Sequence, residues 1–229
     1  MLLYECQLEF HDNLFYETRT LGRLYETGRL LHNIALCYAL GLAQTPFYHS
    51  DDVPRYDAEL AAVNEAGIYV TPAGALDIHY VISTFKYGAE QNYAMMAKSN
   101  RNVPTYGRAK EIGVNSRFRF LVLAEQPVKF PDWIRMGIWL SKARLMVSAP
   151  HELRLVHQRR TETIRAVPLN PADLPAGASV NVFDLVSMRP TSLIENAELH
   201  AESWWVWTDA GGTNYLPAGM RHNVLGLRG

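Results

Sequence analysis

The sequence has only two cysteines and no long apolar run. Cys6 and Cys37 stand singly in apolar surroundings, without the CxxC spacing of zinc or redox sites. We expect both to be buried thiols in a reducing compartment. No stretch reaches the roughly 18 apolar residues of a membrane-spanning helix, and Met1 to Phe10 lacks the pattern of a secretory signal. These absences predict a cytoplasmic protein without membrane contact.

Motifs of nucleotide binding and hydrolysis are also missing. The sequence contains no GxxxxGK[ST], no GxGxxG after an expected strand, no HExxH and no GxSxG. The eight histidines are scattered, with no pair at the spacing of metal ligands, so we expect no metal and no other cofactor. His11-Asp12-Asn13 is explained more simply by an Asx-type turn than by catalysis. The sequence therefore predicts no catalytic residues.

Charge is modest in amount and uneven in distribution. The chain is 48% hydrophobic and 20% charged, which is typical of a globular protein. Residues 1–85 hold 4 Lys and Arg against 11 Asp and Glu, whereas residues 86–165 hold 15 against 6. This net charge of +9 over the middle third indicates a nucleic-acid or acidic partner. The alternative is a solvated face that balances the acidic thirds within the same fold.

Hydrophobic periodicity predicts a single α+β domain, residues 1–229, built on an antiparallel sheet. A period of two predicts strands over 2–10, 78–85, 117–122 and 134–141, with further strands over 145–156, 180–188 and 203–208. A period near 3.6 predicts a helix over 28–42. A second helix is expected after Pro54, with Asp57 as N-cap and Gly67 as its stop. A short helix is expected near Thr191, and Gly211-Gly212 should form a hairpin turn.

The segment from Lys86 to Arg119 interleaves cations with aromatic rings and amides. Cations neutralise phosphates, and rings stack on unpaired bases at about 1–3 kcal/mol each. A turn at Asn102-Val103-Pro104 would make Asn92–Lys98 and Thr105–Ile112 the two arms of a protruding hairpin. The alternative is an exposed loop that binds nothing. The candidate RNA-binding residues of this segment are Lys86, Tyr87, Asn92, Lys98, Arg101, Asn102, Tyr106, Arg108, Lys110 and Arg117.

A second basic set, Arg135, Lys142 and Arg144, lies in the expected strand region after Trp133. The alternation places Arg135 and Trp139 on one face, opposite Met136 and Ile138. This face would be a sheet-surface platform for RNA. The alternative is an outer face whose arginines pair with acids. Three other tryptophans, Trp204, Trp205 and Trp207, are expected to pack within a strand rather than to stack on bases.

The N-terminal block resembles a known family. HDNLFYETRTLGRLYETGRLLHNIALCYALGL (His11 to Leu42) and GIYVTPA (Gly67 to Ala73) are similar to the Csc-one type subunit of type I-D CRISPR Cascade. This is the type I-D version of the Cas-five family. PTYGR (residues 104–108) and RMGIWLSKA (residues 135–143) resemble that family's hairpin and its glycine-containing strand. The likeness covers most of the first 145 residues and is weaker beyond them.

The resemblance implies an RRM-like (ferredoxin-like) antiparallel sheet with an inserted β-hairpin thumb at about 92–110. It implies a non-catalytic subunit that binds and caps the 5′ handle of the CRISPR RNA. Its partners would be the backbone (Cas-seven type) subunit and the large subunit of type I-D Cascade. The assembled complex would recognise target DNA in antiviral defence, with guide processing left to a separate ribonuclease. Arg19, Arg23 and Arg29 would contact RNA or a neighbour, or form internal ion pairs.

Two alternatives stay open at this point. The first is a metal-independent endoribonuclease that processes the precursor CRISPR RNA. It would need a His, Lys or Tyr beside a 2′-hydroxyl, and His79, Lys86 and Tyr87 are candidates. The second is a protein-assembly module whose basic third docks on an acidic subunit.

Overall fold

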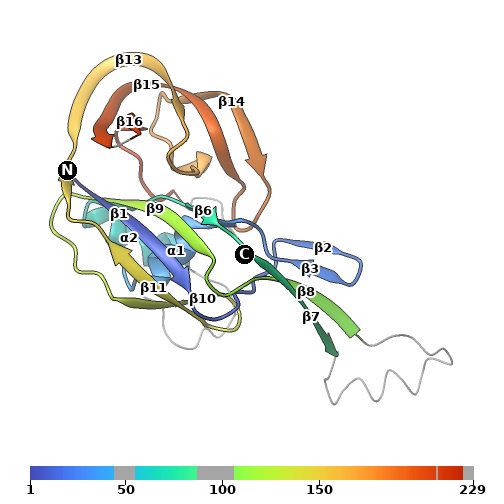
Figure 1. Cartoon of the computed structure of the whole chain (residues 1–229). Coiled ribbons are helices and arrows are strands. Elements are labelled where there is room, and N and C mark those ends of the chain that lie inside the picture. The colour runs from blue at the N-terminus through green and yellow to red at the C-terminus, as the bar shows by residue number, and fades with distance from the viewer. Residues whose placement is uncertain (44–54, 87–105, 210, 224–229) are drawn as a thin grey trace.

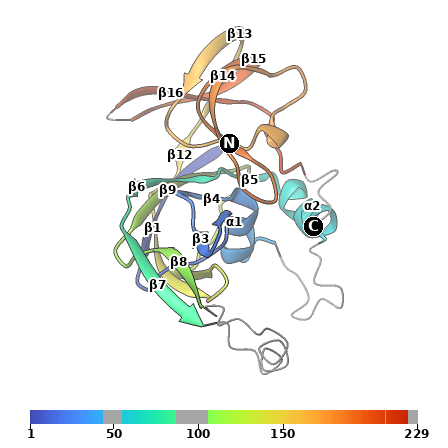
Figure 2. The ribbon, with the colours of Figure 1, turned by 90° about the vertical axis from the view of Figure 1, so that its right-hand side faces the viewer.

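The computed structural model describes residues 1–43, 55–86, 106–209 and 211–223. Within these ranges the chain is mostly β, with three sheets and two short α-helices (Figure 1, Figure 2). One sheet and the helices form the body, a second curled sheet covers one end of it, and a third projects from it. The helical content is thus well below what the α+β expectation implied.

The first sheet runs through the centre of the body in the order β10-β11-β1-β9-β6-β4. All its pairs are antiparallel, with β12 also pairing with β1 and β5 with β9. The strand expected at the N-terminus is confirmed as β1. The strands of this sheet in the described ranges are β1 (Leu2–Phe10), β4 (Leu30–Leu31), β5 (Ile68–Val70), β6 (Ala73–Asp77), β9 (Arg117–Ala124), β10 (Trp133–Met136), β11 (Ser141–Val147) and β12 (His151–Glu152).

Helices α1 (Asn33–Ala39) and α2 (Tyr56–Glu65) are present where helices were expected, with different bounds. The first is shorter than predicted because Leu30–Leu31 joins the sheet as β4, and the His32 side chain caps the helix start. In α2 Asp57 lies in the first turn and not at the N-cap. From there its negative charge still interacts favourably with the positive end of the helix dipole. Gly67 follows the helix at φ +63°, as predicted for a helix stop. Neither helix is long enough to cross a bilayer.

The main core lies between these helices and one face of the first sheet. Cys6, Leu8 and Phe10 from β1 pack there with residues of α1 and α2 such as Cys37 and Leu60. All five are fully buried. Both cysteines are free thiols in this core, which confirms their expected burial.

The second sheet closes over one end of the opposite face. Leu3, Leu121 and Leu123 of the first sheet pack there against Leu199 and Trp204. Trp204 and Trp207 are buried in this core and Trp205 partly buried beside it, so the three tryptophans pack as expected. Register shifts in two of its strand pairs accompany the strong curl. Its strands are β13 (Arg154–Ile164), β14 (Ser179–Val186), β15 (Leu193–Asp209) and β16 (Gly212–Pro217).

The helix expected near Thr191 is wrong. The chain enters β15 at Leu193, and both Leu193 and Ile194 are buried. Leu193 packs on Leu30, while Ile194 bridges to Leu169 and joins the second core. Tertiary pairing on both sides of this segment outweighs its local capping pattern. The expected hairpin turn at Gly211-Gly212 is supported by the pairing of Asp209 with Gly212.

The third sheet, called the arm below, projects from the body (Figure 1). Its order is β2-β3-β8-β7, and β3 runs parallel to β8. Its strands are β2 (Arg19–Leu21), β3 (Leu24–Glu26), β7 (Tyr80–Lys86) and β8 (Tyr106–Ile112).

One expectation about the arm is corrected by its pairing. Of the expected arm Thr105–Ile112, residues Tyr106–Ile112 form β8, and the antiparallel partner of β8 is β7. Because β3 takes the other edge of β8 over Arg108–Lys110, both edges of that strand are already occupied. Asn92–Lys98 itself lies outside the described residues.

Candidate nucleic-acid interface

One face of the arm collects cations and aromatic rings. Alternation along β8 turns Tyr106, Arg108 and Lys110 outward, while Ala109 and Glu111 are buried on the other side. The Arg23 guanidinium lies 5.5 Å from the centre of the Tyr106 ring. These predicted RNA-binding residues therefore share one exposed surface with an additional arginine.

The cations of this face differ in how far they are neutralised. Lys110 Nζ lies 4.1 Å from the Tyr80 ring centre and 3.5 Å from a carboxylate oxygen of Glu26. Arg19 binds the same carboxylate at 2.5 Å, and its hydrogen bond, with help from Lys110, lowers the pKa of Glu26. No carboxylate in the described ranges pairs with Arg108. Arg108 and Arg23 are therefore the described cations of the arm that no carboxylate neutralises.

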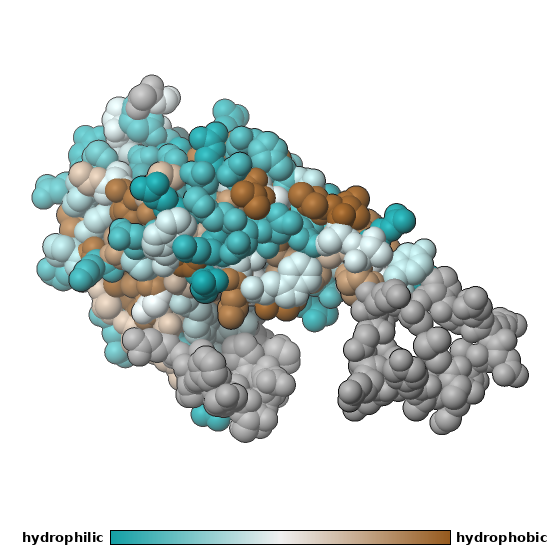
Figure 3. Space-filling model, turned by 60° about the horizontal axis from the view of Figure 1, so that its bottom comes forward, coloured by the Kyte–Doolittle hydropathy of each residue, from teal (hydrophilic) through white to brown (hydrophobic). Residues whose placement is uncertain are grey.

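A second candidate surface lies on the open half of the first sheet, the part that the second sheet leaves uncovered. Strand register places Trp133, Arg144, Glu9, Arg117 and Asp77 side by side across five strands. Directly opposed residues of antiparallel strands point to the same face. This row is partly to fully exposed, and hydrophilic side chains dominate the body in Figure 3.

Trp133, Arg135, Lys142 and Arg144 form the cationic end of that surface, here called the Trp133 patch. Arg135 lies opposite Lys142, one row from the pair of Trp133 and Arg144. Trp133 is 42% exposed, and Lys142 Nζ lies 4.0 Å from its ring centre. The His11 ring meets the same indole edge-on at 5.0 Å. The patch thus combines an exposed aromatic surface with three cations.

The cations of this patch differ from the other cations on the same face of the sheet, which form ion pairs. Arg117 lies 3.7 Å from Asp77, and Arg119 lies 3.1 Å from Glu5 and 3.6 Å from Asp209. By contrast, no carboxylate within the described part of the chain lies at ion-pair distance from Arg135, Lys142 or Arg144. The alternative stated for Arg135, Lys142 and Arg144, an outer face whose arginines pair with acids, thus finds no ion pair among the described residues.

The expected pairing of Arg135 with Trp139 on one strand face is wrong. β10 ends at Met136, because Gly137 at φ +74° and Leu140 at φ +54° take the chain out of the extended conformation. Trp139 instead stacks on Phe15, with ring centres 4.7 Å apart. The tryptophan that shares a strand face with Arg135 is Trp133. The period-two pattern could have predicted this neighbour, since Trp133 precedes Arg135 by two residues.

The remaining predicted residues are placed only in part. Lys86 ends β7 opposite Tyr106, but only its backbone is described. Of the early arginines, Arg19 pairs with Glu26 and Arg29 with Glu195 at 2.5 Å, so these two form the internal ion pairs that were one alternative. The predicted residues outside the described ranges are Tyr87, Asn92, Lys98, Arg101 and Asn102.

Two of the residues considered for a ribonuclease site, His79 and Lys86, lie at opposite ends of one strand, and the third, Tyr87, lies outside the described residues. His79 lies just before β7 and Lys86 at its far end, so seven residues of extended chain separate them by about 23 Å. His79 instead faces Asp77 at 3.8 Å. Within the described ranges no group of three or more His, Cys, Asp or Glu side chains could hold a metal ion.

A buried polar network joins α1 to the segment around His222. Asp173 accepts hydrogen bonds from the Asn33 amide at 2.6 Å, the Tyr69 hydroxyl at 3.1 Å and the backbone N–H of Asn223 at 2.9 Å. His222 Nε2 lies 3.4 Å from Cys37 Sγ, and its Nδ1 lies 3.9 Å from Asp173. The network thus links segments far apart in the chain.

This thiol, imidazole and carboxylate are unsuited to nucleophilic catalysis. Burial raises the pKa of the Cys37 thiol and lowers that of His222 to about 4, so both are neutral at pH 7. Cys37 is 0% exposed and offers no surface to a substrate. A thiolate is needed for attack. The network therefore holds the fold together.

Asp173 and His222 of this network, together with the buried cap residue His32, predict a pH-dependent stability. Burial lowers the pKa values of His32 and His222 to about 4 and raises that of Asp173 to about 6. Between pH 6 and 4 the two histidines gain protons on unfolding, whereas Asp173 loses one, so the free energy of unfolding falls on acidification. We expect a loss of about 3 kcal/mol from pH 7 to 4.5, measured by urea unfolding.

A double variant, His32→Gln with His222→Gln, checks this assignment. Only Asp173 then remains, and because its pKa is raised on folding, its contribution to stability increases on acidification. In the double variant the contribution of these groups to the free energy of unfolding should therefore rise between pH 7 and 4.5, whereas in the wild type it falls. An unchanged slope would show that these histidines are not responsible.

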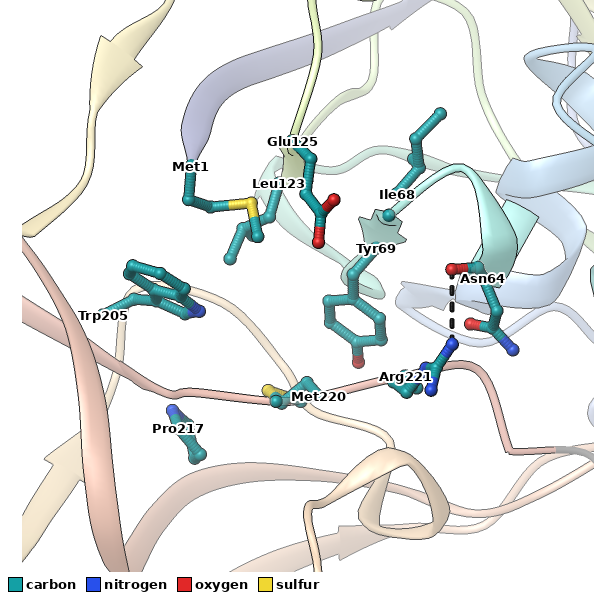
Figure 4. Close-up of a pocket in the computed structure, with 12 residues that line it drawn as sticks. Met1, Asn64, Ile68, Tyr69, Leu123, Glu125, Trp205, Pro217, Met220 and Arg221 are labelled. Carbon is teal, nitrogen blue, oxygen red and sulfur yellow. Dashed lines mark hydrogen bonds between the residues drawn. The ribbon is translucent and has the colours of Figure 1, made fainter. Parts of the chain in front are cut away.

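A cavity of about 350 Å³ lies between the body and the second sheet (Figure 4). Met1, Tyr69, Trp205 and Met220 are among its apolar lining residues. Arg221 donates to the Asn64 carbonyl at 3.4 Å on its rim. None of the predicted RNA-binding residues in the described part of the chain lines it.

Comparison with known proteins identifies a family. A family model described as type I-D CRISPR-associated protein Cas5/Csc1 matches residues 1–223. No curated protein matches the sequence.

Two solved structures match the chain at low sequence identity and with TM-scores below 0.5. A chain of the type III-B Cmr-beta complex bound to cognate target RNA and AMPPnP has 8% identity and a TM-score of 0.47, covering 86% of this chain and 85% of its own. A CRISPR protein from Archaeoglobus fulgidus has 11% identity and a TM-score of 0.40, covering 97% and 100%. Since the family match spans nearly the whole chain, this protein belongs to the type I-D CRISPR-associated Cas5/Csc1 family.

Proposed function

We propose that this protein is a non-catalytic subunit of a type I-D CRISPR surveillance complex and binds the 5′ handle of the CRISPR RNA. Family membership supports the CRISPR role. The observation that carries RNA binding is the Trp133 patch, where three cations without a described carboxylate partner surround an exposed indole. The arm adds Arg108 and Tyr106 on its exposed face.

The chemistry of both surfaces suits single-stranded RNA. An indole or phenol ring stacks on any unpaired base, and nearby cations contact the flanking phosphates. The Tyr106 hydroxyl can also hydrogen-bond to a 2′-hydroxyl or a phosphate. An RNA duplex would present a deep, narrow major groove that side chains cannot read. The handle is therefore bound as an unpaired strand.

An RRM-like core is part of this proposal. In a ferredoxin-like sheet the first and third strands are central, with the fourth beside the first and the second beside the third. The order β11-β1-β9-β6 has this form, and both helices follow the first strand. Residues 125–132, where a second helical segment would be expected, contain no helix. The hairpin of β7 and β8 would be the root of the thumb.

The same proposal includes the partners of the subunit. The backbone (Cas-seven type) and large subunits would hold the protein at one end of the complex, and the assembled particle would recognise target DNA. Precursor cleavage by this chain is the alternative. The separation of His79 from Lys86 argues against it, because an acid–base pair must reach one scissile phosphate.

A binding and cleavage assay distinguishes the two functions. The isolated protein, incubated in EDTA with labelled precursor CRISPR RNA, should shift the RNA in a native gel and leave its length unchanged. RNA of equal length with a scrambled handle is the control and should bind more weakly. A discrete cleavage product in EDTA would replace the proposal with the ribonuclease, and equal affinity for both RNAs would remove the handle as its ligand.

A further inference from the structure

The cavity between the body and the second sheet has both aromatic and charged walls (Figure 4). Trp205 and Tyr69 supply the rings, and Met220 adds apolar surface. Its charged side chains are those of Glu125 and Arg221. Small-molecule sites combine apolar walls with a few polar groups in this way, at volumes of roughly 300–1,000 Å³. The 350 Å³ of this cavity lie at the lower end of that range, which suits a single small ligand and not a polymer.

The Glu125 carboxylate is directed into this space. The Glu125 N–H donates to the Gly67 carbonyl at 3.2 Å, which fixes the backbone at the cavity wall. A Cβ atom at Gly67 would lie 2.5 Å from Glu125 Cδ, so the glycine leaves room for the carboxyl group. Figure 4 shows this group extending toward the space between Trp205 and Tyr69. Among the described residues no hydrogen bond or ion pair reaches the carboxylate, so both oxygens can accept from a ligand.

The chain segment that carries Met220 and Arg221 is fixed in place. The Asn64 amide donates to the His222 carbonyl at 2.9 Å and accepts from the His222 N–H at 3.0 Å. The Arg221 N–H donates to the Asp173 carbonyl at 3.2 Å. Within the described part of the chain, the Arg221 guanidinium bonds only to the Asn64 carbonyl, at 3.4 Å. Most of its five N–H donors therefore remain for an anion.

The aromatic walls are also held in position. Trp205 lies in the middle strand β15, opposite Leu155 of β13 on one side and Leu216 of β16 on the other. Its ring is partly buried against the second core. The Tyr69 hydroxyl donates to Asp173 at 3.1 Å, which fixes the second ring. A planar ligand bound against the indole gains stacking energy, as nucleobases do on aromatic side chains.

Hydrogen-bonding capacity selects among planar ligands. An ionised carboxylate only accepts hydrogen bonds, so Glu125 favours a ligand edge with two adjacent donors. Guanine has such an edge, formed by its N1–H and its exocyclic amino group. Adenine and cytosine carry a ring acceptor beside the amino group, and uracil carries carbonyl oxygens on both sides of its N–H. Each of these three bases would place lone pairs against the carboxylate, whereas a phosphate on the ligand would pair with Arg221.

We propose that this cavity binds a guanine nucleotide. Glu125 accepts from the Watson–Crick edge of the base, Trp205 stacks on its ring, and Arg221 pairs with the 5′-phosphate. The nucleotide is a free one or an unpaired guanine of a bound RNA, since both present the same chemistry. The site is separate from the Trp133 patch and from the arm, so it does not depend on handle RNA being bound there.

Calorimetric titration of the full chain with 5′-GMP tests the site. We expect GMP to bind with a Kd of about 1 mM or tighter. IMP lacks the exocyclic amino group and should bind about 10-fold or more weakly, because one charge-assisted hydrogen bond is lost. Guanosine lacks the phosphate and should be weaker by a similar factor. No heat of binding with GMP, or equal affinities for GMP, IMP and AMP, would overturn the proposal.

Glu125→Gln keeps the size of the side chain and changes its hydrogen bonding. A glutamine amide offers one acceptor and one donor, which match the adjacent donor and acceptor of adenine. GMP affinity should therefore fall about 10-fold or more, and the preference should shift toward AMP. The control, Glu202→Gln, removes the same charge from an exposed position on β15 and should bind GMP as wild type does. Both variants should unfold at the wild-type temperature, and unchanged GMP affinity in Glu125→Gln would show that this cavity is not the site.

Competition with handle RNA identifies the source of the nucleotide. If an RNA guanine occupies the cavity, the RNA should displace GMP, and RNA with inosine in place of guanosine should not. If RNA and GMP bind at the same time, the ligand is a free nucleotide. Replacing Arg135, Lys142 and Arg144 by Gln in the Trp133 patch should leave GMP affinity unchanged. Loss of handle binding and loss of GMP binding are thus measured separately, so either proposal can fail without the other.

Discussion

Replacing Arg135, Lys142 and Arg144 by Gln is expected to flatten the salt dependence of RNA binding by about two units of log Kd against log salt. Each phosphate contact with single-stranded RNA contributes about 0.7 to that slope because it releases a counterion. At 50 mM salt the loss of affinity should be on the order of 10²-fold. Fluorescence anisotropy with a labelled handle RNA between 50 and 300 mM salt measures both quantities.

A second triple variant separates local contact from net charge. Arg154→Gln, Arg159→Gln and Arg165→Gln remove the same charge from exposed positions near β13, in the second sheet. If the Trp133 patch contacts phosphates, this control should change the slope much less. Equal changes in the two variants would mean that RNA responds to the overall charge and that the patch is not a site.

Replacing Asp173 by Ala is expected to lower the free energy of unfolding by about 3–6 kcal/mol. Three donors then lose their acceptor inside the protein: the Asn33 amide, the Tyr69 hydroxyl and the Asn223 N–H. Each buried unsatisfied donor costs about 1–3 kcal/mol. Urea unfolding followed by tryptophan fluorescence at pH 7 measures the change.

Asp184→Ala is the matched control for that measurement. Asp184 is exposed on β14 and accepts a hydrogen bond from Asn196 at 2.7 Å. Water replaces this bond when the carboxylate is removed, so we expect a loss below about 1 kcal/mol. A similarly small effect of Asp173→Ala would show that the network contributes little to stability.

Local patterns predicted some strands of the body and misplaced others, since the strand expected over 134–141 ends at Met136. Period-two alternation over 117–122 and at the N-terminus leads directly to β9 and β1, because both strands bury one face. The same reasoning failed where long-range pairing decides the outcome. Leu30–Leu31 fits a helical pattern but forms β4 opposite Ala73 and Gly74. A local pattern contains no information about that partner.

The candidate site was predictable in its composition and less so in its arrangement. The +9 charge of the middle third locates the cations, and the structure gathers several of them on two surfaces. Which cations are neutralised depends on residues distant in sequence, as Arg119 with Asp209 shows. The buried network around Asp173 and His222 was not foreseen, since scattered polar residues in a sequence give no sign of meeting in a core.

The second sheet covers only one end of this face of the first sheet. The covered and the exposed ends are therefore under different evolutionary constraints. At one end Leu3 and Leu121 must stay apolar to pack under the second sheet. At the other end the residues of the Trp133 patch are exposed, so packing does not require them to be apolar. Substitutions at the two ends should therefore combine additively, and the exposed end can change its ligand specificity during evolution without loss of foldedness.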